Sequence, residues 1–113
     1  MLFEPRDEFN DATRAVFLEK IRAAATEIRS IRRFRVGRRV VHRLPGYEQA
    51  MTADYGYAAI IEFDDLGGLM EYLRHAAHAA LGDYFALAAK RALAYDFELA
   101  DAAGVSASGC DLM

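Results

Sequence analysis

The sequence predicts an α+β domain in which one four-stranded antiparallel sheet carries its helices on a single face. Two observations lead to this prediction. Short segments of alternating apolar side chains are interleaved with longer segments of helical period, in the order β-α-β-β-α-α-β. In addition, residues 55–63 read as a strand that is apolar on both faces, which places it centrally in the sheet and covered on both sides.

Size and composition fit a single globular domain. The chain has 113 residues, which is enough for one hydrophobic core. We expect the domain to span residues 1–99 and residues 100–113 to form a flexible tail, because small residues without periodicity fill that stretch. No secretory signal and no apolar run of the ~20 residues that cross a membrane are seen. The lone Cys110 allows no internal disulfide. A cytoplasmic location without a membrane partner is therefore expected.

The first half of the chain predicts a strand, a helix and a second strand. The first strand is a stub, because Pro5 cannot donate to a sheet ladder. Asn10 or Asp11 caps the following helix. That helix buries a stripe with helical spacing: Phe17, Ile21, Ala24 and Ile28, widened by Val16. Residues 31–41 form the next strand, in which apolar side chains alternate with arginines, and Pro45-Gly46 marks the turn of a loop over residues 42–54.

The second half predicts the central strand, two helices and a last strand. Tyr55 to Phe63 is the central strand, and Asp64-Asp65 begins the helix after it. The inner side chains of that helix are expected to be Leu66, Leu69, Met70 and Leu73. A second helix over residues 77–90 is expected to bury Leu81, Tyr84, Phe85 and Ala88. Residues 93–99 alternate apolar and polar side chains and are assigned to the last strand.

This element order is a ferredoxin-like plan, and such a sheet has one face without helices. Tyr55, Tyr57 and Phe63 share one face of the central strand, and Ala58 and Ile60 lie on the other. Because both faces are apolar, we predict that two subunits pack sheet on sheet as a homodimer. The aromatic residues are candidate ligand-binding side chains, although packing at the dimer core explains them equally well.

A resemblance to a known family is carried by four segments in the expected order: Ile31–Gly37, Tyr55–Asp65, Tyr72–His78 and Asp96–Glu98. From about Phe3 to Glu98 the chain resembles the stress-responsive dimeric α/β-barrel (Dabb) family. The resemblance implies a homodimer whose two sheets face each other as a barrel. Most members have no assigned chemistry.

One plant member of that family, olivetolic acid cyclase, closes a polyketide with a tyrosine and the second histidine of a His-x-x-His motif. The resemblance implies that Tyr72 and His78 are the corresponding pair. The chain departs from the family in two places. Its first strand is short and lacks a histidine, and Ala76 stands where most members have proline, which removes a rigid φ constraint between the helices.

Tyr72, His75 and His78 are the chemically richest cluster. On an unbroken helix, Tyr72 and His78 lie about 120° apart, so only a bend near Ala76-Ala77 brings them together. His78 is then a candidate general base and Tyr72 a group that polarises a carbonyl oxygen. His75 is a candidate ligand contact. The alternative is structural, with both histidines bonded to backbone groups at the helix junction. The pattern favours the structural or ligand-contact role over catalysis.

Two other binding classes are not favoured. Zinc sites use three or four protein ligands, and no third ligand stands out beside the two histidines, so we assign no metal and no cofactor. Arg29 to Arg43 contains seven arginines and no acid, but the chain carries a net charge of −3 and that strand has no aromatic stacking pattern. We therefore expect a basic edge strand and no nucleic-acid partner. A carboxylate ligand for these arginines is more plausible.

These observations support three functions. The first is a homodimer that binds or processes a small, partly apolar or anionic ligand in a pocket between helices and sheet. The second is a cofactor-free enzyme that works through Tyr72 and His78, as a polyketide cyclase, a lyase, an isomerase or, by analogy of fold alone, a monooxygenase. The third is a structural stress-response dimer without a ligand.

Overall fold

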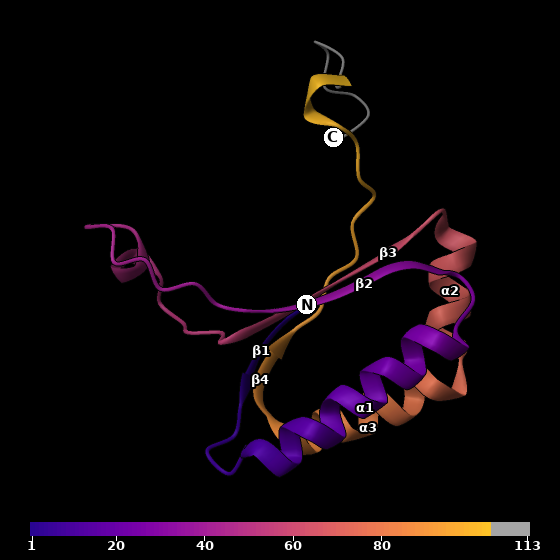
Figure 1. Ribbon diagram of the computed structural model, residues 1–113. Coiled ribbons are helices and arrows are strands. Elements are labelled where there is room, and N and C mark those ends of the chain that lie inside the picture. Colours follow the sequence, from indigo (N-terminus) through magenta and orange to yellow (C-terminus); the bar gives the residue numbers. More distant parts are fainter. Residues whose placement is uncertain (105–113) are drawn as a thin grey trace.

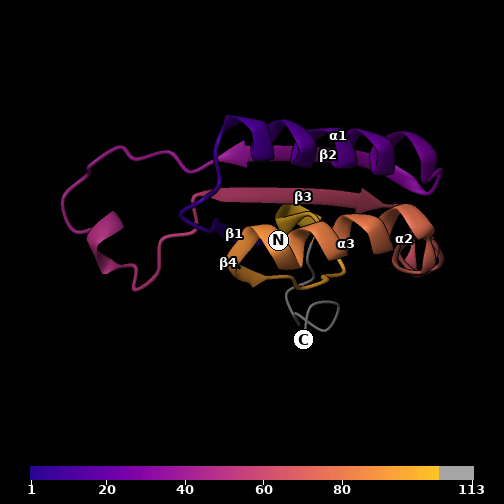
Figure 2. The ribbon, with the colours of Figure 1, turned by 90° about the horizontal axis from the view of Figure 1, so that it is seen from below.

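In the computed structural model, residues 1–104 are described, and they form one four-stranded antiparallel sheet with its helices on one face (Figures 1 and 2). The strands are β1 (Leu2–Pro5), β2 (Ile31–Arg38), β3 (Tyr57–Phe63) and β4 (Ala89–Leu93). The α-helices are α1 (Asp11–Glu27), α2 (Leu66–Arg74) and α3 (Ala76–Ala88), and short 3₁₀ turns are η1 (Glu48–Ala50) and η2 (Ala102–Gly104). The sheet order β2-β3-β1-β4, with every neighbour antiparallel, confirms the ferredoxin-like plan.

Strand β3 is central, as its apolar pattern predicts. It pairs with β2 on one side, where Phe34 lies opposite Ile61, and with β1 on the other, where Phe3 lies opposite Tyr57. Within residues 1–104 no helix has the length and apolarity to cross a bilayer. Residues 105–113, which make up most of the flexible tail expected at residues 100–113, lie outside the described residues.

Helix α1 begins with a reciprocal cap. The Asn10 side chain accepts a hydrogen bond from the Thr13 N–H at 3.0 Å, and the Asn10 N–H donates to the Thr13 hydroxyl at 2.7 Å. The predicted stripe is correct, since Phe17, Ile21, Ala24 and Ile28 are all buried. Val16 does not widen it: its side chain is 46% exposed, because the sheet lies under a narrower face of the helix.

Phe3 is the centre of the core. Its ring lies 4.7 Å from that of Phe85 and 5.3 Å from that of Phe17, and Phe9 and Tyr57 complete the cluster at 5.9 and 5.6 Å. These centroid separations are those of favourable aromatic pairs. The cluster packs strand β1 and helix α3 against helix α1. Although β1 is short, it therefore contributes to the core.

The last strand is placed wrongly by the sequence pattern. Strand β4 is Ala89–Leu93, so only Leu93 of the expected residues 93–99 belongs to a strand, and residues 94–99 have no strand structure. The reason is the length of β1: Leu93 lies opposite Leu2, the first residue of that strand, so no backbone partner remains beyond it. The alternating side chains Tyr95, Phe97 and Leu99 are 69%, 78% and 78% exposed.

Helix α2 begins where predicted, since the Asp65 side chain accepts a hydrogen bond from the Gly68 N–H at 2.8 Å. Its buried face is only partly the predicted one. Leu69 packs against the core as expected, but Leu66 and Leu73 are 71% and 39% exposed, and Tyr72 is the buried side chain of the helix. The helix spans only nine residues and packs at the end of the sheet (Figure 1). Fewer of its side chains are therefore covered than the spacing of its leucines predicts.

Strand β2 ends at Arg38, and residues 39–56 form a long loop that extends away from the sheet (Figures 1 and 2). The left-handed backbone at Arg43 and Gly46, with φ of 61° and 77°, turns this loop beside the predicted Pro45-Gly46 signal. The Glu48 carboxylate accepts hydrogen bonds from the Arg43 and His42 N–H groups, and these bonds lower its pKa.

The face of the sheet opposite the helices is less apolar than predicted. Apart from the small Ala58, the larger apolar side chains on it are Leu2, Ile60 and Leu93, and they are 42%, 53% and 37% exposed. Two ion pairs cross the same face, Arg35 to Glu62 at 3.1 Å and Arg91 to Glu4 at 2.5 Å. The aromatic residues of β3, Tyr57 and Phe63, point to the helix side and pack against the core.

Candidate functional site

The junction between α2 and α3 is a single residue, His75. It is the last, extended residue after α2 and the N-cap of α3, with φ −74° and ψ 143°. Its Nδ1 accepts a hydrogen bond from the Ala77 N–H at 3.0 Å. A side-chain acceptor at this position satisfies a free N–H of the first helical turn. The helix therefore breaks here without a proline, since residue 76 is an alanine.

The break brings Tyr72 and His78 together. Their ring centroids are 4.5 Å apart and the ring planes are inclined by 59°. On a continuous helix the two side chains point about 120° apart and do not meet. The helix junction at His75 thus positions both rings over the same region.

The hydrogen bonding of His78 defines its tautomer. Its Nδ1 lies 3.2 Å from the carbonyl oxygen of Leu73. Because a carbonyl oxygen can only accept, this bond requires a hydrogen on Nδ1. In the neutral ring, Nε2 then carries the lone pair, and it is the nitrogen that can accept a proton.

Tyr72 is a buried phenol at the end of α2. Its residue is 9% exposed, and its ring packs on Phe63 at 5.2 Å. Burial raises the pKa of the Tyr72 phenol above its ordinary value of 10.0, and the charge of Asp96 raises it further. At neutral pH the group is therefore a hydroxyl, which suits it to donate a hydrogen bond and not to act as a base.

Tyr72 and His78 line a cavity of about 390 Å³ between the sheet and the helices. Its walls are largely apolar, with Phe34 and Ile61 from the sheet and Leu81 from α3. Cavities of this size and polarity are typical of sites for small organic ligands. We call it the Tyr72 cavity.

Two small residues of α3, Gly82 and Ala86, also line the Tyr72 cavity. A Cβ atom at Gly82 has no heavy atom within 4 Å, so space remains open beside this position. Nothing in the sequence pattern singles these residues out, because they lie in an alanine-rich helix where small side chains are common.

The other predicted site residues lie elsewhere. His75 is committed to the helix cap, and Phe63 packs behind Tyr72. Tyr57 lines a different cavity beside Phe3, and the ring of Tyr55 lies 5.6 Å from the Arg91 guanidinium carbon. Among the residues predicted for the site, only Tyr72 and His78 line the Tyr72 cavity.

The geometry of residues 1–104 supports neither a metal site nor a phosphate-binding cluster of arginines. Within residues 1–104, no three His, Cys, Asp or Glu side chains gather as a metal site would require. Three arginines of the 29–43 cluster pair with acids of the same chain: Arg32 with Asp64, Arg35 with Glu62 and Arg39 with Asp54. Strand β2, which carries Arg32 and Arg35, is an edge of the sheet, as expected.

The protein is thus a small α+β protein with a ferredoxin-like sheet order and a cavity between its helices and its sheet. The sequence profile of one family, the stress responsive A/B barrel domain (Dabb), matches residues 1–99. The chain therefore belongs to the Dabb family. A comparison with curated protein sequences gave no match.

Three solved structures are similar to this chain. A dimeric protein of unknown function with a ferredoxin-like fold, from Bacteroides fragilis, is 29% identical, with a TM-score of 0.55 over 80% of this chain and 82% of that one. A protein from Arabidopsis thaliana is 17% identical, with a TM-score of 0.72 over 88% and 91%. A dimeric ferredoxin-like protein of unknown function from Thermobifida fusca is also 17% identical, with a TM-score of 0.61 over 80% and 77%. The last two likenesses concern the fold alone.

Proposed function

We propose that this protein is a homodimer that binds a small, partly apolar ligand carrying a carbonyl group in the Tyr72 cavity. The observation that carries the proposal is the contact between the Tyr72 and His78 rings, 4.5 Å apart, at the wall of that cavity. The apolar walls favour the body of such a ligand. A neutral phenol and an imidazole nitrogen can then recognise its oxygen by hydrogen bonds.

The dimer is supported by the uncovered sheet face. Leu2, Ile60 and Leu93 stay partly exposed there, and Tyr95, Phe97 and Leu99 extend beyond the end of the sheet. Exposed apolar residues gathered on one face are typical of association surfaces. Two of the similar structures are described as dimeric proteins. A second copy of this chain is therefore the partner that we propose for this face.

Ligand binding can be tested with prodan, a neutral naphthyl ketone whose fluorescence reports the polarity around its carbonyl. We expect saturable binding with a blue shift of emission, because the cavity is apolar. The variant Gly82→Leu fills the open space beside Gly82 and should abolish binding. It should not destabilise the fold, because leucine has a higher helix propensity than glycine.

The matched control is Ala80→Leu, which adds the same side chain to an exposed position of α3 that does not line the cavity. This variant should bind prodan with the affinity of the natural protein. Absence of saturable binding, or equal binding by Gly82→Leu and Ala80→Leu, would contradict the proposed site.

A second candidate function is general acid–base catalysis at a carbon beside a carbonyl. It is favoured by the Nδ1 hydrogen bond of His78, which leaves Nε2 able to take a proton. Tyr72, held neutral by burial, would donate a hydrogen bond to the carbonyl oxygen as negative charge develops there. The proton on carbon moves to His78 Nε2, and the electron pair moves to the carbonyl oxygen as an enolate.

This candidate is tested by deuterium exchange at the benzylic carbon of 1-phenylpropan-2-one in D₂O, followed by NMR. Loss of a general base lowers a rate by about 10²–10⁴-fold. His78→Gln should therefore reduce protein-catalysed exchange by that factor, while prodan still binds. If exchange is no faster with the natural protein than in buffer, the protein is a binding protein for such ketones and not a catalyst.

A further inference from the structure

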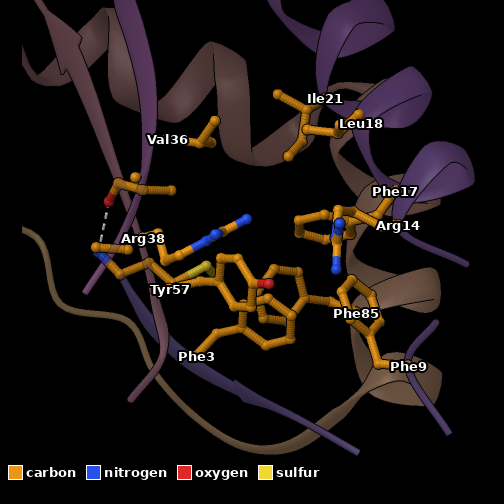
Figure 3. Close-up of a pocket in the computed structure, with 14 residues that line it drawn as sticks. Phe3, Phe9, Arg14, Phe17, Leu18, Ile21, Val36, Arg38, Tyr57 and Phe85 are labelled. Carbon is orange, nitrogen blue, oxygen red and sulfur yellow. Dashed lines mark hydrogen bonds between the residues drawn. The ribbon is translucent and has the colours of Figure 1, made fainter. Parts of the chain in front are cut away.

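A second cavity, of about 210 Å³, lies between α1 and the sheet beside the short strand β1 (Figure 3). We call it the Arg14 cavity. Its walls are aromatic, with Phe3, Phe9, Phe17, Tyr57 and Phe85. Phe17 and Phe85 also line the Tyr72 cavity, so these two rings belong to a wall that both hollows share.

Two arginines reach the Arg14 cavity from opposite walls. Arg14 comes from the first turns of α1, and Arg38 comes from the end of β2. Figure 3 shows both guanidinium groups directed into the space above the aromatic rings, with the Tyr57 hydroxyl oxygen beside them. An apolar hollow with two cations and a hydroxyl at one end has the shape of a site for an amphipathic anion.

The arginines are poorly neutralised by the protein itself. The Nε atom of Arg14 is buried without a hydrogen-bond partner. Its Nη1 atom lies 3.3 Å from Asp11, but that carboxylate is 97% exposed, and such an ion pair is weak. Within residues 1–104, Arg38 forms no ion pair, whereas its neighbours Arg35 and Arg39 do.

Two like charges that face one apolar space repel each other. A carboxylate placed between them relieves this repulsion, since the planar guanidinium group offers paired donors that match its two oxygens. The acid nearest to Arg14 on its own helix, Asp11, faces solvent and leaves the cavity side of the guanidinium free for such a ligand.

We propose that the Arg14 cavity binds a small aromatic monocarboxylate, with its ring among the phenylalanines and its carboxylate between Arg14 and Arg38. The volume of about 210 Å³ is below the range of about 300–1,000 Å³ typical of drug-sized ligands, so a compound with one ring fits the site. This site is distinct from the Tyr72 cavity and does not depend on the function proposed for it.

The test is calorimetric titration with 3-phenylpropionate and with its neutral amide, 3-phenylpropanamide. The carboxylate should bind at least about tenfold more tightly, because a charge-assisted hydrogen bond discriminates by about that factor. Arg38→Gln should lower the affinity for the carboxylate by about tenfold and leave that for the amide unchanged. Arg14→Gln should do the same, with thermal melting to verify its fold.

Two variants serve as controls. Arg33→Gln removes an arginine of the same strand that does not line this cavity, and it should leave both affinities unchanged. Gly82→Leu blocks the Tyr72 cavity and should also leave 3-phenylpropionate binding unchanged. Equal affinity for acid and amide, no binding of the acid, or loss of binding in Gly82→Leu would each overturn the proposal.

Discussion

The rings of Tyr72 and His78 are 4.5 Å apart, although a helix break separates them in the chain. His75 creates this break by accepting the Ala77 N–H at 3.0 Å and thereby starting a new helix. The first histidine of the motif is thus a positioning residue for the second. Tyr72, His75 and His78 therefore have different roles, and each role can be tested by a different measurement.

Tyr72 should be hard to ionise. Burial of the phenol, and then the charge of Asp96, raise its pKa in the folded protein above the ordinary value of 10.0. Stability linked to this group is therefore complete below about pH 10 and is lost as the pH rises through the raised pKa of the folded state. The difference in phenolate absorbance between the natural protein and Tyr72→Phe should have its midpoint above the ordinary tyrosine pKa of 10.0. A midpoint at or below that pH would contradict this expectation.

The cap at His75 should stabilise the helix junction. His75→Ala removes the acceptor for the Ala77 N–H and should cost about 0.5–2 kcal/mol of unfolding free energy. His75→Asn restores a side-chain acceptor and should recover most of that loss. Both values come from urea unfolding at one protein concentration. If His75→Ala and His75→Asn are equally stable, the histidine does not act as a cap.

Phe3 should be the most sensitive core position. Its side chain is 3% exposed and contacts four other aromatic rings, so Phe3→Ala should cost about 3–5 kcal/mol. The midpoint of urea unfolding should fall while its slope is retained. Leu66→Ala, at a position that is 71% exposed, should change stability by less than about 0.5 kcal/mol. Similar losses in the two variants would mean that the aromatic cluster is not the core.

The uncovered sheet face should hold the partner subunit. Ile60 is 53% exposed near the middle of that face, opposite Arg35 of β2. Ile60→Lys places a charge in the proposed interface and should shift light scattering at micromolar concentration from twice the chain mass to the chain mass.

The control for this change is Leu66→Lys, which alters an exposed leucine on the helix side of the molecule. It should leave the dimer intact. A natural protein that scatters as a monomer would exclude the dimer, and loss of the dimer in both variants would place the interface elsewhere.

Helices and strands whose buried side chains recur at a regular spacing were predictable from the sequence. The stripe from Phe17 to Ile28 has an unbroken helical period over about three turns, and the apolar run of β3 determined its central place. The last strand was not predictable, because its length depends on the partner strand. Leu93 pairs with Leu2, where β1 begins. The alternating pattern of residues 93–99 carries no information about the length of this partner strand.

The candidate site was predictable only in part. The motif pointed to Tyr72 and His78, but their contact depends on the cap at His75, and histidine is not among the residues preferred at that position. Arg14 was not singled out as a site residue. Its spacing of three residues from Phe17 was the signal that it lies next to the buried stripe.

The most direct test of the central claim is proton NMR of the imidazole groups during a titration with prodan. The chain has three histidines, so their resonances can be separated and assigned by the His78→Gln variant. We expect the His78 resonance to shift saturably, with the dissociation constant obtained from prodan fluorescence, while the resonance of His42 in the long loop stays unchanged. A His78 resonance that does not move while the fluorescence saturates would show that the ligand does not occupy the cavity beside Tyr72 and His78.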